Sequence, residues 1–369
     1  MKRIMGVINL INDPDRLEEL TLGRCLASVP FGGRYRLIDF PLSNMVNSGI
    51  EDVAVFTYHK YRSLMDHLGS GKEWDLDRKR GGLFVLPSVL DIPSGISKGD
   101  LFQFFSHRDY FYRGRQEYVL VSRSHIVCNI DYRRVLEQHE ETGADITCVY
   151  YETDDEDDAI YRKLAVDPDG RIMAMQDRTG RLVSRNVSME MYLMSKSLLL
   201  DMVETCLAQG DDHLVRDGIM KNLSKLRMYG YKHQGYTGVV NTIQSYYRHS
   251  MELLDPTLLR ELFFQGAPIY TKVKDEPPTK YTESASVRNS LVANGCVVEG
   301  VVENSLLARG VKVRPGAVVR NCILMQNCEI GDNVILEHAI LDKDVCIDRG
   351  RVLSGAVSAP FIAAKKKVI

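Results

Sequence analysis

Over the first two-thirds of the chain, short apolar runs alternate with amphipathic stretches. The apolar runs predict strands at Met5–Leu10, Val53–Thr57, Tyr118–Val121 and Ile146–Tyr151. The amphipathic stretches predict helices at Pro41–Ser48, Tyr132–Thr142 and Ser195–Leu207. This alternation indicates an α/β domain with a largely parallel sheet covered by helices on both faces. Ligands of such sheets bind beyond the carboxyl ends of the strands, so the segment after the first strand is the first place to look for a site.

From Ser284 onward the pattern changes to single apolar residues at every sixth position. One row contains Leu306, Val318, Leu324, Ile330 and Leu336, and a second contains Val311, Ala317, Ile323, Ile335, Leu341 and Ile347. This period predicts a left-handed parallel β-helix of hexapeptide repeats, with three repeats in each triangular coil. Cys328 and Cys346 are eighteen residues apart, so we expect them to stack on successive coils. We therefore predict an α/β domain at 1–250, a connector at 251–283 and a β-helix domain at 284–369.

Composition narrows the function classes. The 369 residues include 47 basic and 49 acidic side chains, so no global field attracts nucleic acid or a membrane surface, and neither is an expected partner. No apolar stretch is long enough to span a bilayer and no signal-type cleavage site follows the first strand, which favours a cytoplasmic location. The eight cysteines form no C-x-x-C pair, which argues against a zinc site or a disulfide framework.

Several motifs point to one family. The block Pro30–Asn44 reads PFGGRYRLIDFPLSN, the strand at Glu117–Val121 reads EYVLV, and the block at Pro277–Tyr281 reads PPTKY. In these motifs and in the order of its domains, nearly the whole chain resembles the ADP-glucose pyrophosphorylase family, also called glucose-1-phosphate adenylyltransferases. The resemblance implies a nucleotidyltransferase-like, Rossmann-like domain with a mixed, mostly parallel sheet. It also implies a site that makes ADP-glucose from ATP and glucose 1-phosphate with Mg²⁺.

The phosphate-binding part of that family pattern is missing. Where the family has a glycine-rich turn, this chain has the segment 11–15, Ile-Asn-Asp-Pro-Asp. Glycines let successive backbone N–H groups surround phosphates, whereas Pro14 lacks an N–H group and Asp13 and Asp15 bring negative charge toward a polyanion. Leu26 replaces the family's lysine.

The metal-binding and sugar-binding positions also differ from the family. Ser124 and Val239 replace the two acids that the resemblance implies for Mg²⁺, and neither supplies a carboxylate oxygen. Phe102 replaces a loop aspartate, and Glu190 replaces a glycine that leaves room for the sugar phosphate. Arg178 and Ser188 are the remnants on the sugar-phosphate side. We therefore expect no catalytic residue and no cofactor in this chain, and assign Mg²⁺ and ATP to a catalytic partner.

This combination of a kept scaffold and a lost site is similar to the GlgD-type subunits of the bacterial enzyme. That resemblance implies a regulatory subunit that joins a GlgC-type catalytic subunit in a heterotetramer, and it leaves open a homo-oligomer of the chain alone. One alternative is a divergent enzyme that binds metal through Asp131, Asp13 or Asp15. A second is a stand-alone sensor of a nucleotide or sugar phosphate. An acyltransferase is disfavoured, because the β-helix region offers only His338 as a base.

Five basic residues are candidates for binding a phosphorylated effector. They follow the retained glycine pair or the second strand, and they are Arg34, Arg36, His59, Lys60 and Arg62. Arginine suits phosphate because its planar fork makes bidentate contacts. The alternative is that these side chains pair with surface acids.

Overall fold

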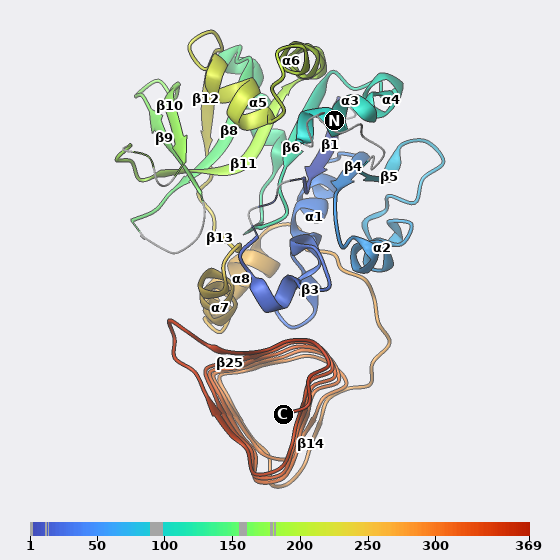
Figure 1. Ribbon diagram of the computed structural model, residues 1–369, viewed down its shortest axis with the longest axis vertical. Coiled ribbons are helices and arrows are strands. Elements are labelled where there is room, and N and C mark those ends of the chain that lie inside the picture. The colour runs from blue at the N-terminus through green and yellow to red at the C-terminus, as the bar shows by residue number, and fades with distance from the viewer. Residues whose placement is uncertain are drawn as a thin grey trace.

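The computed structural model describes residues 3–11, 13, 15–88, 99–154, 161–177, 180 and 182–369. Figure 1 shows a sheet with helices on both sides, placed above a triangular coil seen end-on. The sheet domain takes the first part of the chain and the coil takes the last part, which confirms the predicted fold class.

The described residues form a nine-stranded mixed sheet in the first domain. Its main order is β10-β9-β11-β6-β1-β4-β5, and β8 pairs with both β11 and β12. The strands are β1 Ile4–Asn9, β4 Asp52–Thr57, β5 Gly82–Pro87, β6 Tyr118–Ser122, β8 Ile146–Glu152, β9 Arg162–Val166, β10 Ile172–Asp177, β11 Asn186–Ser195 and β12 Met228–Lys232. Strands β5, β4, β1 and β6 are parallel, whereas β11 runs antiparallel to β6, β8 and β9.

Helices cover both faces of this sheet. They are α1 Asp39–Asn47, α2 Arg62–Leu68, α3 Asp100–Ser106, α4 Arg108–Arg113, α5 Tyr132–Thr142, α6 Lys196–Ala208, α7 Ile243–Glu252 and α8 Pro256–Arg260. Short helical turns lie at Glu18–Thr21, Leu26–Ser28, Lys72–Trp74, Leu214–Ile219, Met220–Asn222 and Glu261–Gln265. In β1, Ile4 and Ile8 belong to the core that includes α1 and α5, and Met5 and Val7 belong to the core that includes α3, α4 and α6. The two-residue alternation of a strand produces this division.

Two small strand pairs shape the underside of the sheet domain. β2 Pro30–Phe31 pairs with β3 Tyr35–Arg36, and β7 Ile126–Cys128 pairs with β13 Thr237–Val239. The turn between β2 and β3 holds Gly32 and Gly33 at φ of +58° and +78°, which glycine adopts without strain. This turn accounts for the glycine pair in the retained PFGGRYR block.

The C-terminal domain is a parallel β-helix of three five-stranded sheets, built from residues that the structure describes throughout. One sheet contains β14 Lys280–Tyr281, β17 Val297–Val298, β20 Lys312–Val313, β23 Glu329–Ile330 and β26 Cys346–Ile347. The second contains β15 Ser286–Arg288, β18 Val301–Glu303, β21 Val318–Arg320, β24 Ile335–Glu337 and β27 Val352–Ser354. The third contains β16 Leu291–Val292, β19 Leu306–Leu307, β22 Ile323–Leu324, β25 Ala339–Leu341 and β28 Phe361–Ala363.

The coils are shorter than a strict hexapeptide repeat predicts. Glu329 is in register with Cys346 and Ile330 with Ile347, so this coil contains seventeen residues, whereas Ser286 is in register with Val301, so an earlier coil contains fifteen. The fully buried positions Val313, Val319, Leu324 and Ile330 follow one another at intervals of six, five and six. The stacking predicted for Cys328 and Cys346 is therefore wrong. In a coil of seventeen rather than eighteen residues, Cys346 lies opposite Glu329, and Cys328 is buried in the core.

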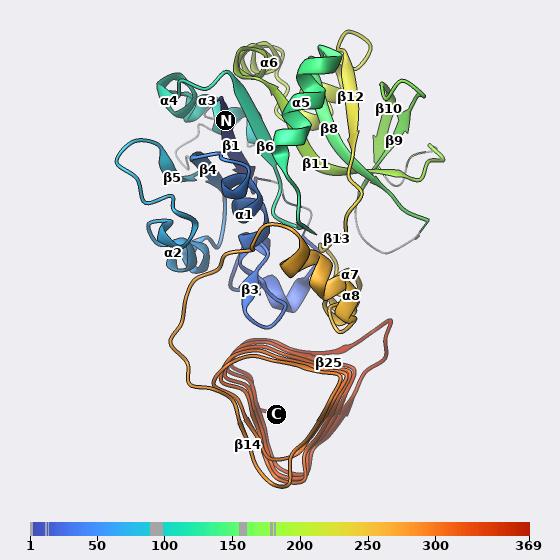
Figure 2. The same ribbon diagram turned by 180° about the vertical axis from the view of Figure 1, so that it is seen from behind.

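One side of the β-helix faces the sheet domain. Figures 1 and 2 show β25 on this side, below α7, α8 and β3. Leu306, Ile323 and Ile340 pack in one cluster with Phe31 and Tyr246 of the first domain. Burial of large apolar groups on both sides joins the two domains through a continuous core. None of the helices in the described residues has the length and apolar character needed to cross a membrane.

Candidate functional site

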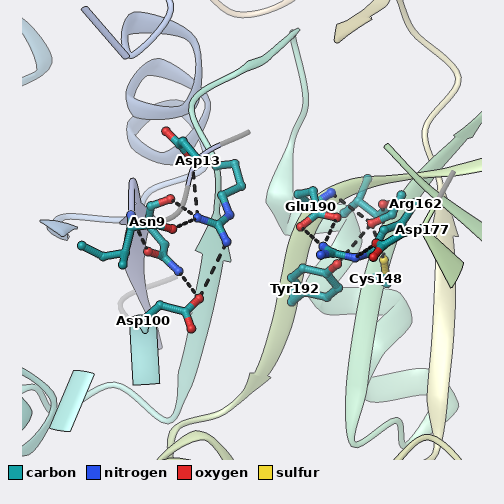
Figure 3. Close-up of polar contacts among 12 residues, drawn as sticks. Asn9, Asp13, Asp100, Cys148, Arg162, Asp177, Glu190 and Tyr192 are labelled. Atoms are coloured by element: carbon teal, nitrogen blue, oxygen red, sulfur yellow. Dashed lines mark hydrogen bonds and ion pairs between the residues drawn. The ribbon is translucent and has the colours of Figure 1, made fainter. Parts of the chain in front are cut away.

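A buried arginine fills the space beyond the ends of β1 and β6. Arg123 follows β6, and its Nη1 donates to the main-chain carbonyls of Asn9, at 3.0 Å, and Ile11. The same nitrogen lies 3.5 Å from Oδ1 of Asp13, and Nη2 lies 3.7 Å from Oδ2 of Asp100. Figure 3 shows Asn9, Asp13 and Asp100 around this network. The guanidinium therefore occupies the edge of the sheet where α/β proteins usually place a ligand.

The two carboxylates of this network are nearly inaccessible. The side chain of Asp13 is 8% exposed and that of Asp100 is 2% exposed. Burial raises the pKa of Asp13 to about 6, against the opposing effects of Arg123 and of a hydrogen bond from Ser124. The network thus sets two carboxyl groups against one guanidinium, and carboxylate charge repels a phosphate group.

A second, partly buried ion pair joins Arg162 of β9 to Glu190 of β11, the strand beside β6. Arg162 Nη1 is 2.7 Å from both Oε1 and Oε2 of Glu190, and its Nε is 2.8 Å from Oδ1 of Asp177. The charge of Glu190 is the main reason that the pKa of Arg162 is raised. β11 runs antiparallel to β6 with Tyr192 opposite Val121, so both networks lie at the same end of these two strands (Figure 3).

The backbone at Glu190 keeps a conformation suited to glycine. Its φ is +52°, and the register of β11 against β8 shifts between Ser188 and Met191. Ser188 Oγ accepts a hydrogen bond from the Glu190 N–H at 3.1 Å and lies 3.4 Å from Sγ of Cys148. A carboxylate therefore fills a bulge in which the resemblance expects a glycine and a sugar phosphate.

The other residues that differ from the family pattern lie in the apolar core or beside the Arg123 network. Leu26 is 2% exposed and packs in the core between the domains. Val239 is 1% exposed in β13, opposite Ile126 of β7, and Ser124 precedes β7 and donates to Asp13. Phe102 lies half-buried in α3. The structure thus brings Ser124 to the Arg123 network and packs Leu26 and Val239 into apolar surroundings.

The acids considered as replacement metal ligands already have partners. Asp15 accepts from the Leu17 N–H and from Thr21 Oγ1. Asp131 caps the N-terminus of α5 and lies 2.8 Å from Nη2 of Arg133. Within the described residues, no three His, Cys, Asp or Glu side chains gather as a metal site would require. Arg178, the remnant proposed on the sugar side, lies outside the described residues.

The five effector candidates do not gather at one point. Arg34 is exposed, and its guanidinium lies 5.9 Å from the ring centre of Tyr35. Arg36 is half-buried and donates to both oxygens of Ser63. His59 and Arg62 are exposed beside α2, and Lys60 donates to the Thr21 carbonyl at 2.7 Å.

Arg36 instead joins a basic cluster at the boundary between the domains. Arg24 forms a buried ion pair with Asp342 of the β-helix. The next residue, Lys343, is half-buried, and its pKa falls to about 7 because of desolvation and of the charges of Arg36 and Arg24. The cluster therefore combines residues from the two ends of the chain.

A cavity of about 370 Å³ lies beside this cluster, between the β2–β3 turn, the connector and the β-helix. Tyr35 and Phe263 stack in its wall with ring centres 4.8 Å apart, and Arg34 and Lys274 line its rim. Arg309 also lines it and is only 6% exposed. The charges of Glu276 and Asp39 act on its guanidinium, but among the described residues no carboxylate lies within ion-pair distance of it. Burial lowers the pKa of Arg309. A buried cation that lacks a close ion-pair partner and lies next to an aromatic wall suits an anionic ligand with an apolar body.

Comparison with known proteins gives the family. Residues 14–254 match the Nucleotidyl transferase family and residues 277–356 match the family described as GlmU-like, C-terminal hexapeptide. Over 98% of its length the chain is 42% identical to the glycogen biosynthesis protein GlgD of Bacillus subtilis strain 168, of which it covers 96%. It is 45% identical to the GlgD protein of Geobacillus stearothermophilus over 86% of this chain and 83% of the relative.

The chain belongs to the GlgD family. A more distant relative is the glucose-1-phosphate adenylyltransferase of Fervidobacterium nodosum, with 32% identity over 95% of this chain and 85% of the relative. The resemblance inferred from the opening block and the EYVLV strand is therefore confirmed. In this GlgD-family chain, the nucleotidyltransferase domain carries the Arg123 and Glu190 networks, and the hexapeptide domain supplies Arg309 and Lys343.

Sequence reasoning missed the residues that fill the site. Arg123 stands where the family motif L-S-G-D-H has its glycine, so the same alignment that exposed Ser124 also contained this signal. Arg162 and Lys343 had no such signal, because the residues that act on them are distant in the sequence. Arg309 had none, because no local pattern predicts that its side chain is buried at the cavity.

Proposed function

We propose that this chain is a non-catalytic, regulatory subunit of a heteromeric glucose-1-phosphate adenylyltransferase that acts in glycogen biosynthesis. The GlgD relatives, named as glycogen biosynthesis proteins, support the pathway. The adenylyltransferase relatives support the reaction to which the subunit contributes. The finer role rests on the chemistry of the filled site.

The observation that carries the proposal is the position of Arg123. Its donors already serve two carbonyls and two carboxylates, so they are not available to a triphosphate. ATP binding would have to break these contacts and leave Asp13 and Asp100 buried beside phosphate charge, at a cost of several kcal/mol per buried unpaired ion. With Ser124 and Val239 at the metal-ligand positions, the chain also lacks the carboxylates for a Mg²⁺ clamp on the transferring phosphoryl group.

Regulation is assigned to the boundary between the domains. A phosphorylated effector would place its anionic group on Arg309 and Arg34 and its apolar part on Tyr35 and Phe263. Binding there would tie the sheet domain to the β-helix. The change would be transmitted to a partner GlgC-type subunit through the contacts between the subunits. That partner would bind Mg²⁺ and ATP and supply the catalytic residues.

The test is Mg²⁺-dependent synthesis of ADP-glucose from ATP and glucose 1-phosphate by three samples. They are the purified chain alone, a GlgC-type subunit alone and the co-purified pair. We expect no turnover by the chain alone and an altered rate or effector response in the pair. Turnover by the lone chain would support a divergent enzyme, and effector binding without any association would support a stand-alone sensor.

A further inference from the structure

A polar cavity of about 570 Å³, the α5 pocket, lies between the end of α1, the start of α5, the end of β12 and the turn Glu261–Gln265. Helices α1 and α5 cover one face of the sheet, whereas Asp100 of the Arg123 network begins α3 on the other face. Figure 2 shows α5 above α8 on this side of the molecule. No described residue lines both this pocket and the cavity beside Arg309. The α5 pocket is therefore separate from both sites described above.

Close packing orients one polar side chain in the wall of the pocket. Asn129 Nδ2 donates to the carbonyls of Leu262, at 3.0 Å, and Ala267, at 2.7 Å. A Cβ at position 266 would lie 2.7 Å from the amide of Asn129, so Gly266 lets this amide pack against the turn. Both amide hydrogens are used within the chain. The carbonyl oxygen of Asn129 remains as an acceptor for a ligand, since no described group donates to it.

Glu261 offers a second acceptor. Its Oε1 accepts the N–H of Tyr236 at 2.5 Å, which holds the carboxylate against the segment that follows β12. Among the described residues, no donor is bonded to Oε2. The exposed amides of Gln234 and Gln265, which also have no partner in the described part of the chain, add donors as well as acceptors. The pocket is therefore lined by unused groups of both kinds.

The charges around the pocket nearly cancel. The two ion pairs are Asp131, which caps α5, with Arg133 at 2.8 Å, and Lys232 with Glu152 at 2.7 Å. Desolvation lowers the pKa of His233, so its imidazole is neutral at pH 7. Arg134 and Glu261 remain, with one charge of each sign. A ligand of this pocket should therefore carry no strong net charge.

A neutral ligand with many hydroxyl groups fits this lining. A hydroxyl both donates and accepts, so it can satisfy the oxygens of Asn129 and Glu261 as well as the free amides. An ionised phosphate offers only acceptors, and the carboxylate of Glu261 would repel it. The half-buried ring of Tyr231 adds an apolar surface to the wall. The volume lies within the range of about 300–1,000 Å³ that is usual for small-molecule sites.

We propose that the α5 pocket binds a neutral sugar, the end of an α-1,4-linked glucan. The choice of a neutral, polyhydroxylated ligand follows from the lining of the pocket. The choice of an α-linked glucan rests on the proposed function in glycogen biosynthesis. Such a site would hold the subunit at the polymer that its pathway makes, away from the filled site and from the cavity beside Arg309.

The experiment is isothermal titration calorimetry of the full-length chain with maltotriose, an α-1,4-linked trisaccharide. We expect saturable binding with a dissociation constant of about 1 mM, as for a small polar ligand. Cellotriose contains the same glucosyl units in β linkage, and its straighter shape should weaken binding by about tenfold. Saturating inorganic phosphate should leave the affinity for maltotriose unchanged, because phosphate would act at the separate cavity beside Arg309.

Glu261→Gln tests the lining of the pocket. The N–H of Tyr236 keeps the amide oxygen on its own side, so the new NH₂ group replaces the acceptor Oε2. We expect maltotriose to bind about fivefold more weakly to this variant. Glu204→Gln is the matched control, because Glu204 is exposed on α6, outside the pocket. Thermal unfolding of both variants verifies that each remains folded.

Gln265→Ala removes an exposed amide that makes no contact within the described chain, so it tests the pocket without disturbing the fold. We expect it to weaken maltotriose binding by about threefold. The exposed Gln209, which follows α6 and lies outside the pocket, provides the control Gln209→Ala. This control should bind maltotriose as the wild type does.

Four results would overturn the proposal. They are no saturable binding of maltotriose, equal binding of cellotriose, weaker binding in the presence of phosphate, and a folded Glu261→Gln variant that binds as tightly as Glu204→Gln. A chain that modulates a GlgC-type subunit but does not bind maltotriose would refute the sugar site and leave the proposed function standing. A chain that binds maltotriose through Glu261 but does not modulate that subunit would do the reverse.

Discussion

Glu190 presents both carboxylate oxygens to Nη1 of Arg162 at 2.7 Å while its own backbone holds a φ of +52°. The conformation is one that non-glycine residues adopt at a cost of about 1–2 kcal/mol. The chain accepts this cost at a position where its catalytic relatives are expected to have glycine. The ion pair offsets the strain, and its two side chains fill the position at which the resemblance implies a sugar phosphate.

The strain at Glu190 separates two substitutions that remove the same carboxylate. Glu190→Ala and Glu190→Gly both break the pair with Arg162. Alanine is still strained in the left-handed backbone conformation, whereas glycine is not. Part of this advantage in stability is lost because glycine has more conformational freedom in the unfolded chain. We expect Glu190→Ala to be less stable than Glu190→Gly by about 1 kcal/mol, measured by urea unfolding. Equal stability would mean that the backbone relaxes out of the left-handed region.

The Arg123 network gives a double-mutant cycle. Arg123→Ala leaves Asp13 and Asp100 buried without their cation, and we expect a loss of about 3 kcal/mol in the free energy of unfolding. Asp13→Asn leaves Arg123 with Asp100 and its carbonyl partners, so the loss should be about 1 kcal/mol. The double variant should be more stable than the sum of the two losses predicts by about 1–3 kcal/mol.

The control for this cycle is Arg133→Ala. Arg133 pairs with Asp131 at 2.8 Å, but its side chain is 56% exposed. An exposed ion pair contributes little to stability because water screens its charges, so this variant should be nearly neutral. If Arg123→Ala is as mild as Arg133→Ala, the guanidinium does not fill the site as tightly as its contacts indicate.

Sequence patterns predicted most of the elements that position the site. The apolar runs located β1, β4, β6 and β8 to within one or two residues, and the six-residue period identified the β-helix. The pattern could not reveal where the coils depart from eighteen residues, because that depends on how each corner of the β-helix turns. It also could not pair Arg24 with Asp342, since this contact joins residues 318 positions apart through domain packing.

Lys343 makes the stability of the domain boundary depend on pH. Its folded pKa of about 7 lies below the ordinary value for lysine, near 10.4, so folding releases a proton between these two values. Stability should therefore rise with pH in this window, and we expect a gain of about 2 kcal/mol between pH 7 and 9. Lys343→Met has no ammonium to bury and should lose this gain. The measurement is urea unfolding of both proteins across that range, and parallel curves would contradict the prediction.

Arg309 tests the cavity between the domains. A buried guanidinium with no carboxylate within ion-pair distance is destabilising, and the more distant charges of Glu276 and Asp39 compensate it only in part. Arg309→Met should therefore raise the free energy of unfolding by roughly 1–2 kcal/mol in buffer without multivalent anions. Inorganic phosphate should reverse the order, because it stabilises a folded state that binds it in proportion to the logarithm of its concentration. We therefore expect added phosphate to raise the Tm of the wild type and to leave that of Arg309→Met unchanged.

Arg62→Met is the matched control, since Arg62 is exposed at the start of α2 and does not line the cavity. This variant should keep the full phosphate response. An equal response in Arg309→Met would show that phosphate acts elsewhere, and a variant less stable than the wild type without phosphate would mean that Arg309 has a structural role in packing the β-helix against the connector. An anion site built on Arg309 requires that Arg309→Met raises the stability without phosphate and also removes the response to phosphate. Burial of the Arg309 charge lowers the stability of the free protein, and a bound anion compensates that charge.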